Sequence, residues 1–322
     1  MSLCFDAYVT HILQDRTRVV FAVGDGSLRG EDGSAVQAHT GAILCAAPHP
    51  SGQGVITGGD DGRLVWTAEG EARQIAGTAG RWIDAVAVAP ATGQIAFAVG
   101  KTVEVRDVKA GDFSRAFVHE RSVAALAFDP KGRRLAAATY GGVALWYGRI
   151  EGQKPVMLRW AGSHLAVDFS PDGRFIVTAM QEAALHGWRV SDAMDMQMGG
   201  YPGKTRSMAF LEGGAWLATS GAQGVVLWPF VGQGGPMGKQ AMEIGADETS
   251  QVVQVAAQTA GTRLAAGLSD GRVWVCDLKS ERVDMLQAQI GAPISALAVL
   301  ADGRVAWGDE AGGAGVAMPK TA

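Results

Sequence analysis

The chain has 322 residues, of which 48% are hydrophobic and 19% charged, and its formal net charge is −4. This composition is typical of a folded globular protein and not of a disordered or fibrous one. The slight acidity argues against a general nucleic-acid binder, because such proteins need an excess of Lys and Arg to neutralise phosphates. No apolar run is long enough to span a membrane, and the first residues lack a secretion leader, so we expect a cytoplasmic protein without membrane contact.

From the N-terminus onward, an apolar strand that runs into a Pro/Gly corner recurs about every forty residues, a period that indicates a propeller or a solenoid. Residues 8–26 form a first copy that lacks the corner glycine. The corners of the later copies end at Gly52, Gly93, Gly132, Gly173, Gly214, Gly261 and Gly303.

Each copy predicts four antiparallel strands. An apolar strand precedes the corner, and a β-type run such as residues 54–59 follows it. Asp-Gly pairs such as Asp61-Gly62 then mark a tight hairpin, because both residues tolerate a positive φ. A short third strand and a more variable, polar fourth strand complete the copy.

The first strand of each copy keeps one register relative to its corner. Four residues after an apolar anchor such as Ile43, the chain has a small residue in six of seven copies, which predicts close packing against this strand. This row consists of Ala47, Ala87, Ala127, Asp168, Ala209, Ala256 and Ala298.

These features resemble the WD-repeat β-propeller family, and the resemblance extends over nearly the whole chain. Residues 169–174, Phe-Ser-Pro-Asp-Gly-Arg, are close to the first hairpin of that family. His39 and His119 each lie four residues before a strand anchor, where the family has its histidine. Thr57 and Asp61 lie where the family has Ser/Thr and Asp. The resemblance implies that His39, Thr57, Asp61 and His119 belong to hydrogen-bonded networks that stabilise the blades.

The tryptophan positions depart from the family pattern. No Trp-Asp dipeptide occurs, Trp66 comes one residue early, and Arg106 and Cys276 replace the tryptophan in other copies. Because Trp66 comes one residue early, the set His39, Thr57, Asp61 and Trp66 is not expected to close into the network of the family.

The expected fold is all-β, a single β-propeller domain over residues 1–322 with four-stranded antiparallel blades. We favour eight blades, and seven are the alternative because the first copy is short. Residues 1–5 are expected to pair beside residues 315–318 and so to complete the last blade, which would leave no sheet edge exposed.

Catalysis, a cofactor and a bound metal are not expected. The six histidines are dispersed without metal-ligand spacing, and the three cysteines form no Cys-x-x-Cys pair, which suits a reducing cytoplasm. Asp168 is the one acid in the alanine row, so the alternative function is a propeller enzyme, or a small-ligand or metal binder, that uses the central channel around Asp168.

The favoured function is a non-catalytic scaffold that docks a protein or peptide, as a monomeric propeller within a complex. In the family that the chain resembles, one rim is built by the loops entering each first strand and by the turns between second and third strands. Trp, Tyr and Arg on such a surface are typical of binding hot spots. A contact on the opposite rim, near His49, Lys131 and Arg133, is a further possibility. The candidate binding residues are Arg81, Trp82, Arg121, Tyr140, Trp160, Glu182, Tyr201, Lys204 and Arg206.

Overall fold

The computed structural model describes residues 1–280 and 282–320. The fold is all-β: strands connected by tight turns make up nearly all of its regular structure, and a single short 3-10 turn, η1 (Glu212–Gly214), is present in the described residues. Within this part of the chain, no helix is long and apolar enough to cross a membrane.

Thirteen strands precede residue 120. They are β1 (Ser2–Cys4), β2 (Val9–Asp15), β3 (Arg18–Val23), β4 (Ser27–Gly30), β5 (Ala35–Gln37), β6 (Ile43–Pro48), β7 (Val55–Gly59), β8 (Arg63–Ala68), β9 (Glu71–Gly77), β10 (Ala85–Ala89), β11 (Gln94–Val99), β12 (Thr102–Asp107) and β13 (Ser114–Val118).

The remaining strands include two of unusual length. They are β14 (Val123–Phe128), β15 (Arg134–Tyr147), β16 (Val156–Phe169), β17 (Phe175–Met180), β18 (Leu185–Arg189), β19 (Asp195–Met198), β20 (Met208–Leu211), β21 (Trp216–Thr219), β22 (Val225–Pro229), β23 (Met242–Ile244), β24 (Val252–Ala257), β25 (Arg263–Leu268), β26 (Val273–Asp277), β27 (Arg282–Gln287), β28 (Ile294–Val299), β29 (Val305–Asp309) and β30 (Gly313–Ala317).

The described strands form seven antiparallel sheets, six with four strands and one with six. The four-stranded sheets have the orders β2-β3-β4-β5, β6-β7-β8-β9, β10-β11-β12-β13, β20-β21-β22-β23, β24-β25-β26-β27 and β1-β30-β29-β28. In the last of these, β1 pairs antiparallel with β30, with Ser2 opposite Gly315. The six-stranded sheet has the order β14-β15-β16-β17-β18-β19.

The six-stranded sheet contains two of the sequence repeats, because β15 and β16 have 14 residues each. The first half of β15 pairs with β14, and its second half pairs with the first half of β16. The second half of β16 then pairs with β17, and the register shifts where the pairings change, at Tyr140 and at His164. Each long strand thus contains two strands of the repeat pattern.

The expected all-β propeller architecture is confirmed, and the number of blades depends on how the six-stranded sheet is counted. The separate sheets number seven in the described residues, which is the alternative count. The sequence pattern favours eight blades, but the described strands form seven sheets, because β16 contains both the last strand of one repeat and the first strand of the next. When β15 and β16 are each counted as two strands, the described residues form eight four-stranded repeats.

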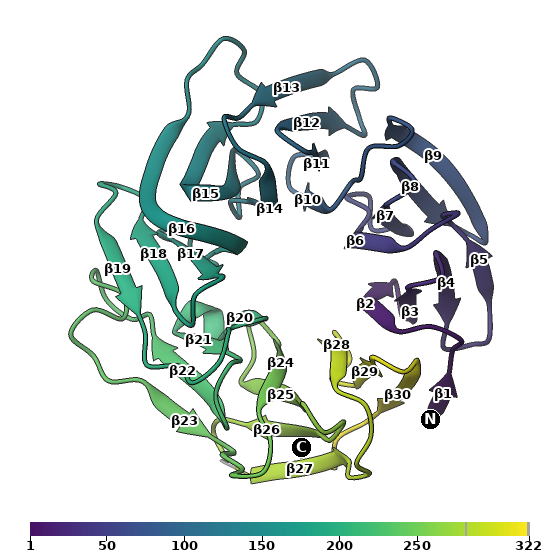
Figure 1. The fold of residues 1–322 in the computed structure, drawn as a ribbon, viewed down its shortest axis with the longest axis vertical. Coiled ribbons are helices and arrows are strands. Elements are labelled where there is room, and N and C mark those ends of the chain that lie inside the picture. Colours follow the sequence, from purple (N-terminus) through teal and green to yellow (C-terminus); the bar gives the residue numbers. More distant parts are fainter. Residues whose placement is uncertain (281, 321–322) are drawn as a thin grey trace. The chain divides into compact units, whose positions relative to one another are not determined.

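The chain divides into two compact units. Unit 1 comprises residues 1–12, 170–175 and 182–322, and unit 2 comprises residues 13–169 and 176–181. In unit 2 the first strands of successive sheets, β6, β10 and β14, lie side by side, as do β20, β24 and β28 in unit 1 (Figure 1). Apolar side chains fill the space between neighbouring sheets, for example Ile56 and Leu64 against Ile83, Ile95 and Phe97.

A second row of small residues lies on the second strand of the repeats. Each member lies two positions after the residue that pairs with the alanine row; for example, Ala47 pairs with Ile56, and Gly58 comes two positions later. The row consists of Gly58, Ala98, Ala138, Ala179, Ser220, Gly267 and Gly308. A Cβ on Gly58 would lie 2.6 Å from Ile83 Cγ2, and a Cβ on Gly267 would lie 2.5 Å from Ile294 Cγ2. The anchor of the next first strand therefore occupies the space that a larger side chain would need.

We predict that Gly58→Ala lowers the free energy of unfolding by about 1–3 kcal/mol, because the added methyl overlaps Ile83 in a packed core. Gly111→Ala is the control, since a Cβ there meets no atom within 4 Å. Urea denaturation of both variants checks the prediction, and equal midpoints would contradict it.

Candidate functional site

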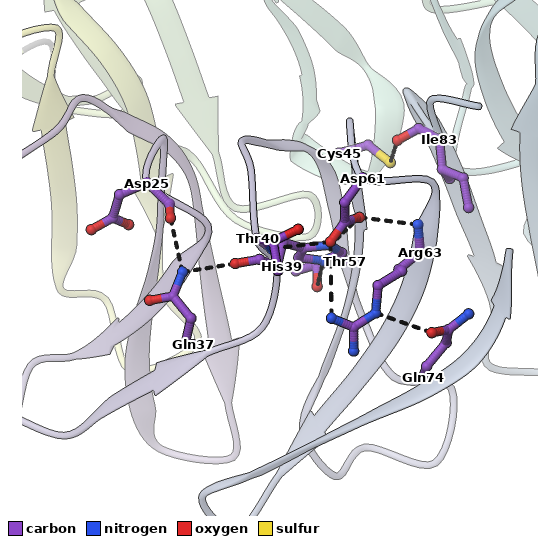
Figure 2. Close-up of polar contacts among 10 residues, drawn as sticks. All are labelled: Asp25, Gln37, His39, Thr40, Cys45, Thr57, Asp61, Arg63, Gln74 and Ile83. Carbon is purple, nitrogen blue, oxygen red and sulfur yellow. Dashed lines mark hydrogen bonds and ion pairs between the residues drawn. The ribbon is translucent and has the colours of Figure 1, made fainter. Parts of the chain in front are cut away.

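The clearest polar network lies in the sheet of β6 to β9 (Figure 2). His39, in the loop that enters β6, is hydrogen-bonded through Nδ1 to Asp61 Oδ1 at 3.0 Å and through Nε2 to Thr57 Oγ1 at 2.8 Å. Burial alone would raise the pKa of Asp61, but hydrogen bonds from His39 and from backbone N–H groups hold it below its usual value. The network ties the entering loop to the second strand and to the hairpin turn.

Trp66 does not join this network. Its Nε1 donates to the backbone oxygen of Gln53 at 3.0 Å, and its ring stacks on His49 with 4.6 Å between centroids. Because side chains alternate between the two faces of a strand, a tryptophan that comes one residue early points away from the His39 network.

Two later threonines in the register of Thr57 have similar partners. Thr178 Oγ1 lies 2.8 Å from His164 Nδ1, and Thr219 Oγ1 lies 2.6 Å from the Tyr201 hydroxyl. Trp228 Nε1 also donates to the Tyr201 hydroxyl at 2.6 Å.

Tyr201 was expected on the binding rim, but its side chain is buried, so this assignment is corrected. The phenol takes the place of the network histidine because Tyr201 lies four residues before the anchor Thr205, the same spacing as His39 has from Ile43. That spacing is the signal that could have identified it. Burial raises the pKa of Tyr201 to about 12, so the hydroxyl stays protonated.

His119 forms a different contact from His39. Trp146 Nε1 donates to His119 Nε2 at 3.0 Å, and His119 Nδ1 lies 3.3 Å from the backbone oxygen of Lys101. Burial lowers the pKa of His119, which favours the neutral ring that this arrangement requires. The neutral histidine holds the loop between β13 and β14 against the tryptophan of the next sheet.

A cavity of about 390 Å³ lies beside this contact, and we call it the Arg121 cavity. It brings together two of the predicted binding residues, Arg121 and Tyr140, and adds three that sequence reasoning missed: Val118, Met157 and Arg159. The Tyr140 side chain is 63% exposed and that of Val118 is 72% exposed. The full lining is Val118, His119, Glu120, Arg121, Thr139, Tyr140, Gly141, Ala144, Trp146, Pro155, Met157 and Arg159.

The other predicted rim residues do not line this cavity. In unit 2, Arg81 and Trp82 are exposed in the loop before β10, and Trp160 is half-buried in β16 with its backbone oxygen near His164 Nε2. In unit 1, Glu182 and Lys204 are exposed. Arg206, also in unit 1, is exposed and lies 3.9 Å from Glu310 in an ion pair.

Asp168 is half-buried on β16, opposite Val177 of β17. Its Oδ1 accepts a hydrogen bond from the backbone N–H of Phe169 at 2.8 Å. Burial raises the pKa of Asp168 to about 6. No group of three or more His, Cys, Asp or Glu side chains suited to a metal ion occurs among the described residues, around Asp168 or elsewhere.

Comparison with known proteins identifies the type of repeat. Residues 31–66, which contain His39, Thr57 and Asp61, match the family model of the WD domain, G-beta repeat. The chain thus carries a segment that matches a WD repeat within a β-propeller fold. The solved structure of the computationally designed protein Ika8 is similar to this WD-repeat propeller, with a TM-score of 0.78 and 18% sequence identity over 97% of this chain and 96% of the designed one. No curated protein matches the sequence.

We expect Tyr201→Phe to lower the free energy of unfolding by about 1–3 kcal/mol, because the loss of the hydroxyl leaves Thr219 and the Trp228 indole N–H without this buried partner. Tyr140→Phe is the matched control, since the Tyr140 side chain is exposed. Thermal melts followed by circular dichroism distinguish the two, and an equal Tm for both variants would rule out the structural role of Tyr201.

The raised pKa of Asp168 predicts an unusual dependence of stability on pH. The native state holds this proton more tightly than the unfolded chain, whose ordinary value is 3.8, so the Asp168 contribution to stability falls as pH rises from 3.8 to about 6. Asp168→Asn should therefore stabilise the protein at pH 7 by up to about 3 kcal/mol. Urea denaturation at several pH values checks this: the gain should vanish below pH 3.8, and a gain that does not change with pH would contradict it.

Proposed function

We propose that this WD-repeat protein is a non-catalytic scaffold that binds an acidic segment of a protein partner at the Arg121 cavity. The observation that carries the proposal is the convergence of Arg121, Tyr140 and Arg159 on one open cavity. Arg and Tyr are enriched among the residues that dominate binding energy at protein interfaces.

The charges of the cavity favour an acidic partner. Neither the Arg121 nor the Arg159 guanidinium has an ion pair or hydrogen bond within the part of the chain that the structure describes, whereas many other arginines do. Glu120 is the single acid in the lining. A carboxylate from a partner would therefore meet two uncommitted guanidinium groups, and an arginine can bind a carboxylate with two parallel hydrogen bonds.

The apolar part of the cavity would bind the neighbouring residues of the same partner. Exposed Val118, Tyr140 and Met157 supply this area on three different segments, β13, β15 and β16. Because these segments belong to hydrogen-bonded sheets and the His119–Trp146 contact fixes the entering loop, we expect little movement on binding.

Three further considerations support a cytoplasmic scaffold over an enzyme. WD-repeat propellers are generally non-enzymatic, and His119, the histidine of this cavity, is already engaged by the Trp146 indole. Within the described residues, Cys4, Cys45 and Cys276 form no disulfide, as expected of a protein in a reducing compartment.

Affinity purification from the native cell tests the proposal. We expect a stoichiometric partner whose recovery falls about tenfold or more with Arg121→Glu/Arg159→Glu, because both guanidinium contacts become repulsive. The Tm should change little, since surface substitutions away from packed sites have small effects on stability.

The matched control is Lys131→Glu/Arg133→Glu, which reverses two exposed charges outside the Arg121 cavity. It should retain the partner. Equal recovery with both double variants would disprove the assignment of the surface, and the lack of any stoichiometric partner would count against the scaffold function itself.

A further inference from the structure

A second and larger cavity lies in unit 2, between the sheet of β6 to β9 and the sheet of β10 to β13. Its volume is about 640 Å³, within the range of small-molecule sites. Strands β8, β9 and β12 contribute to its walls, and Figure 1 shows the two sheets as neighbours. We call it the Trp66 cavity, and its lining shares no residue with the Arg121 cavity.

Two departures from the tryptophan pattern of the family meet in this cavity. The tryptophan position on the third strand is occupied by Trp228 in one sheet, by Thr67 in the sheet of β6 to β9 and by Arg106 in the next sheet. These positions are equivalent because each pairs with the second-strand residue that comes just before the one opposite the alanine row. The paired residues are Leu217, Val55 and Ile95. The sheet of β6 to β9 thus has Thr67 at the usual tryptophan position and Trp66 on the opposite face. In the next sheet an arginine, Arg106, replaces the indole, and both Trp66 and Arg106 line the cavity.

The cavity has an apolar floor. Leu64, Ile75 and Ile95 line it together with the partly buried Trp66. The Trp66 indole is held in place by the stacked His49 ring and by its hydrogen bond to Gln53. Burial lowers the pKa of His49, so this ring is neutral near pH 7 and leaves the charge of the cavity to other groups.

The charged groups of the lining are mostly cationic. Arg73 and Lys109 are exposed, and neither side chain has an ion pair or a hydrogen bond in residues 1–280 and 282–320. Arg106 pairs with Glu104 at 3.0 Å, so its charge is partly offset. The one acid of the lining, Asp107, is bound by the Arg149 guanidinium and by the backbone N–H groups of Lys109 and Ala110.

We propose that the Trp66 cavity binds a small organic anion that combines an apolar ring or chain with a carboxylate, sulfonate or phosphate. The apolar body would lie on Leu64, Ile75 and Trp66, and the anionic group would be bound by Arg73 and Lys109. The uncommitted side chains of Arg73 and Lys109 can donate charge-assisted hydrogen bonds to an anionic group, while the floor of the cavity favours removal of apolar surface from water. This site is separate from the protein-docking surface and does not depend on it.

The probe that tests the proposal is 8-anilinonaphthalene-1-sulfonate, an anion with an apolar aromatic body whose fluorescence rises on binding. We expect saturable binding to the folded full-length chain. Arg73→Gln/Lys109→Gln should weaken the affinity about tenfold or more, because two charge-assisted contacts are lost. N-phenyl-1-naphthylamine, which has the same rings without the sulfonate, should also bind about tenfold more weakly.

Lys131→Gln/Arg133→Gln is the control, and it should bind the probe as the wild type does, because these exposed side chains lie outside the cavity lining. Near-UV circular dichroism verifies that each variant is folded, since the probe also binds partly unfolded chains. The proposal is overturned if the wild type does not bind the probe saturably, if both double variants bind it equally, or if the neutral analogue binds as tightly.

Discussion

The structure depends on one steric constraint, which is the close approach of each first strand to the second strand of the preceding repeat. A β-branched anchor such as Ile83 lies where the side chain of Gly58 would be, and the same contact recurs between Ile294 and Gly267 and between Val9 and Gly308. Since interiors are packed as densely as organic crystals, the second strand must keep a small residue here in the later repeats. Other positions of the repeat can change more freely.

The polar networks show how far the repeat can vary around this constraint. The second-strand threonine in the register of Thr57 has a different hydrogen-bond partner in each of three repeats, which is His39, His164 or Tyr201. Each combination satisfies the buried hydroxyl, which is the physical requirement, although the partner residues differ. Loss of the family tryptophan is tolerated in the same way, because Trp66 finds a backbone oxygen and the His49 ring on the other face of its strand.

Much of the fold could be predicted from the sequence, because corner glycines leave a local signal. Gly52 and Gly173 adopt positive φ of 75° and 71°, a conformation that other residues adopt at a cost. The fusion of two repeats through β16 could not be predicted, since residues 160–164 look like an ordinary loop that enters a first strand. For the sites, the resemblance to the WD-repeat family implied the network residues His39 and Thr57, whereas Arg159 and Met157 lie on a variable outer strand whose facing neighbours only the three-dimensional packing reveals.

The continuous strand β16 also limits how the gene for this protein can change. In a repeat bounded by loops, one unit can be duplicated or deleted with a cut at each loop. Between the two fused repeats the boundary lies within β16, from Val156 to Phe169, so such a cut would sever a strand in the middle of its hydrogen bonding. Removal of either of these two repeats alone would therefore cut through a paired strand, whereas removal of a loop-bounded sheet would leave the strands of its neighbours whole.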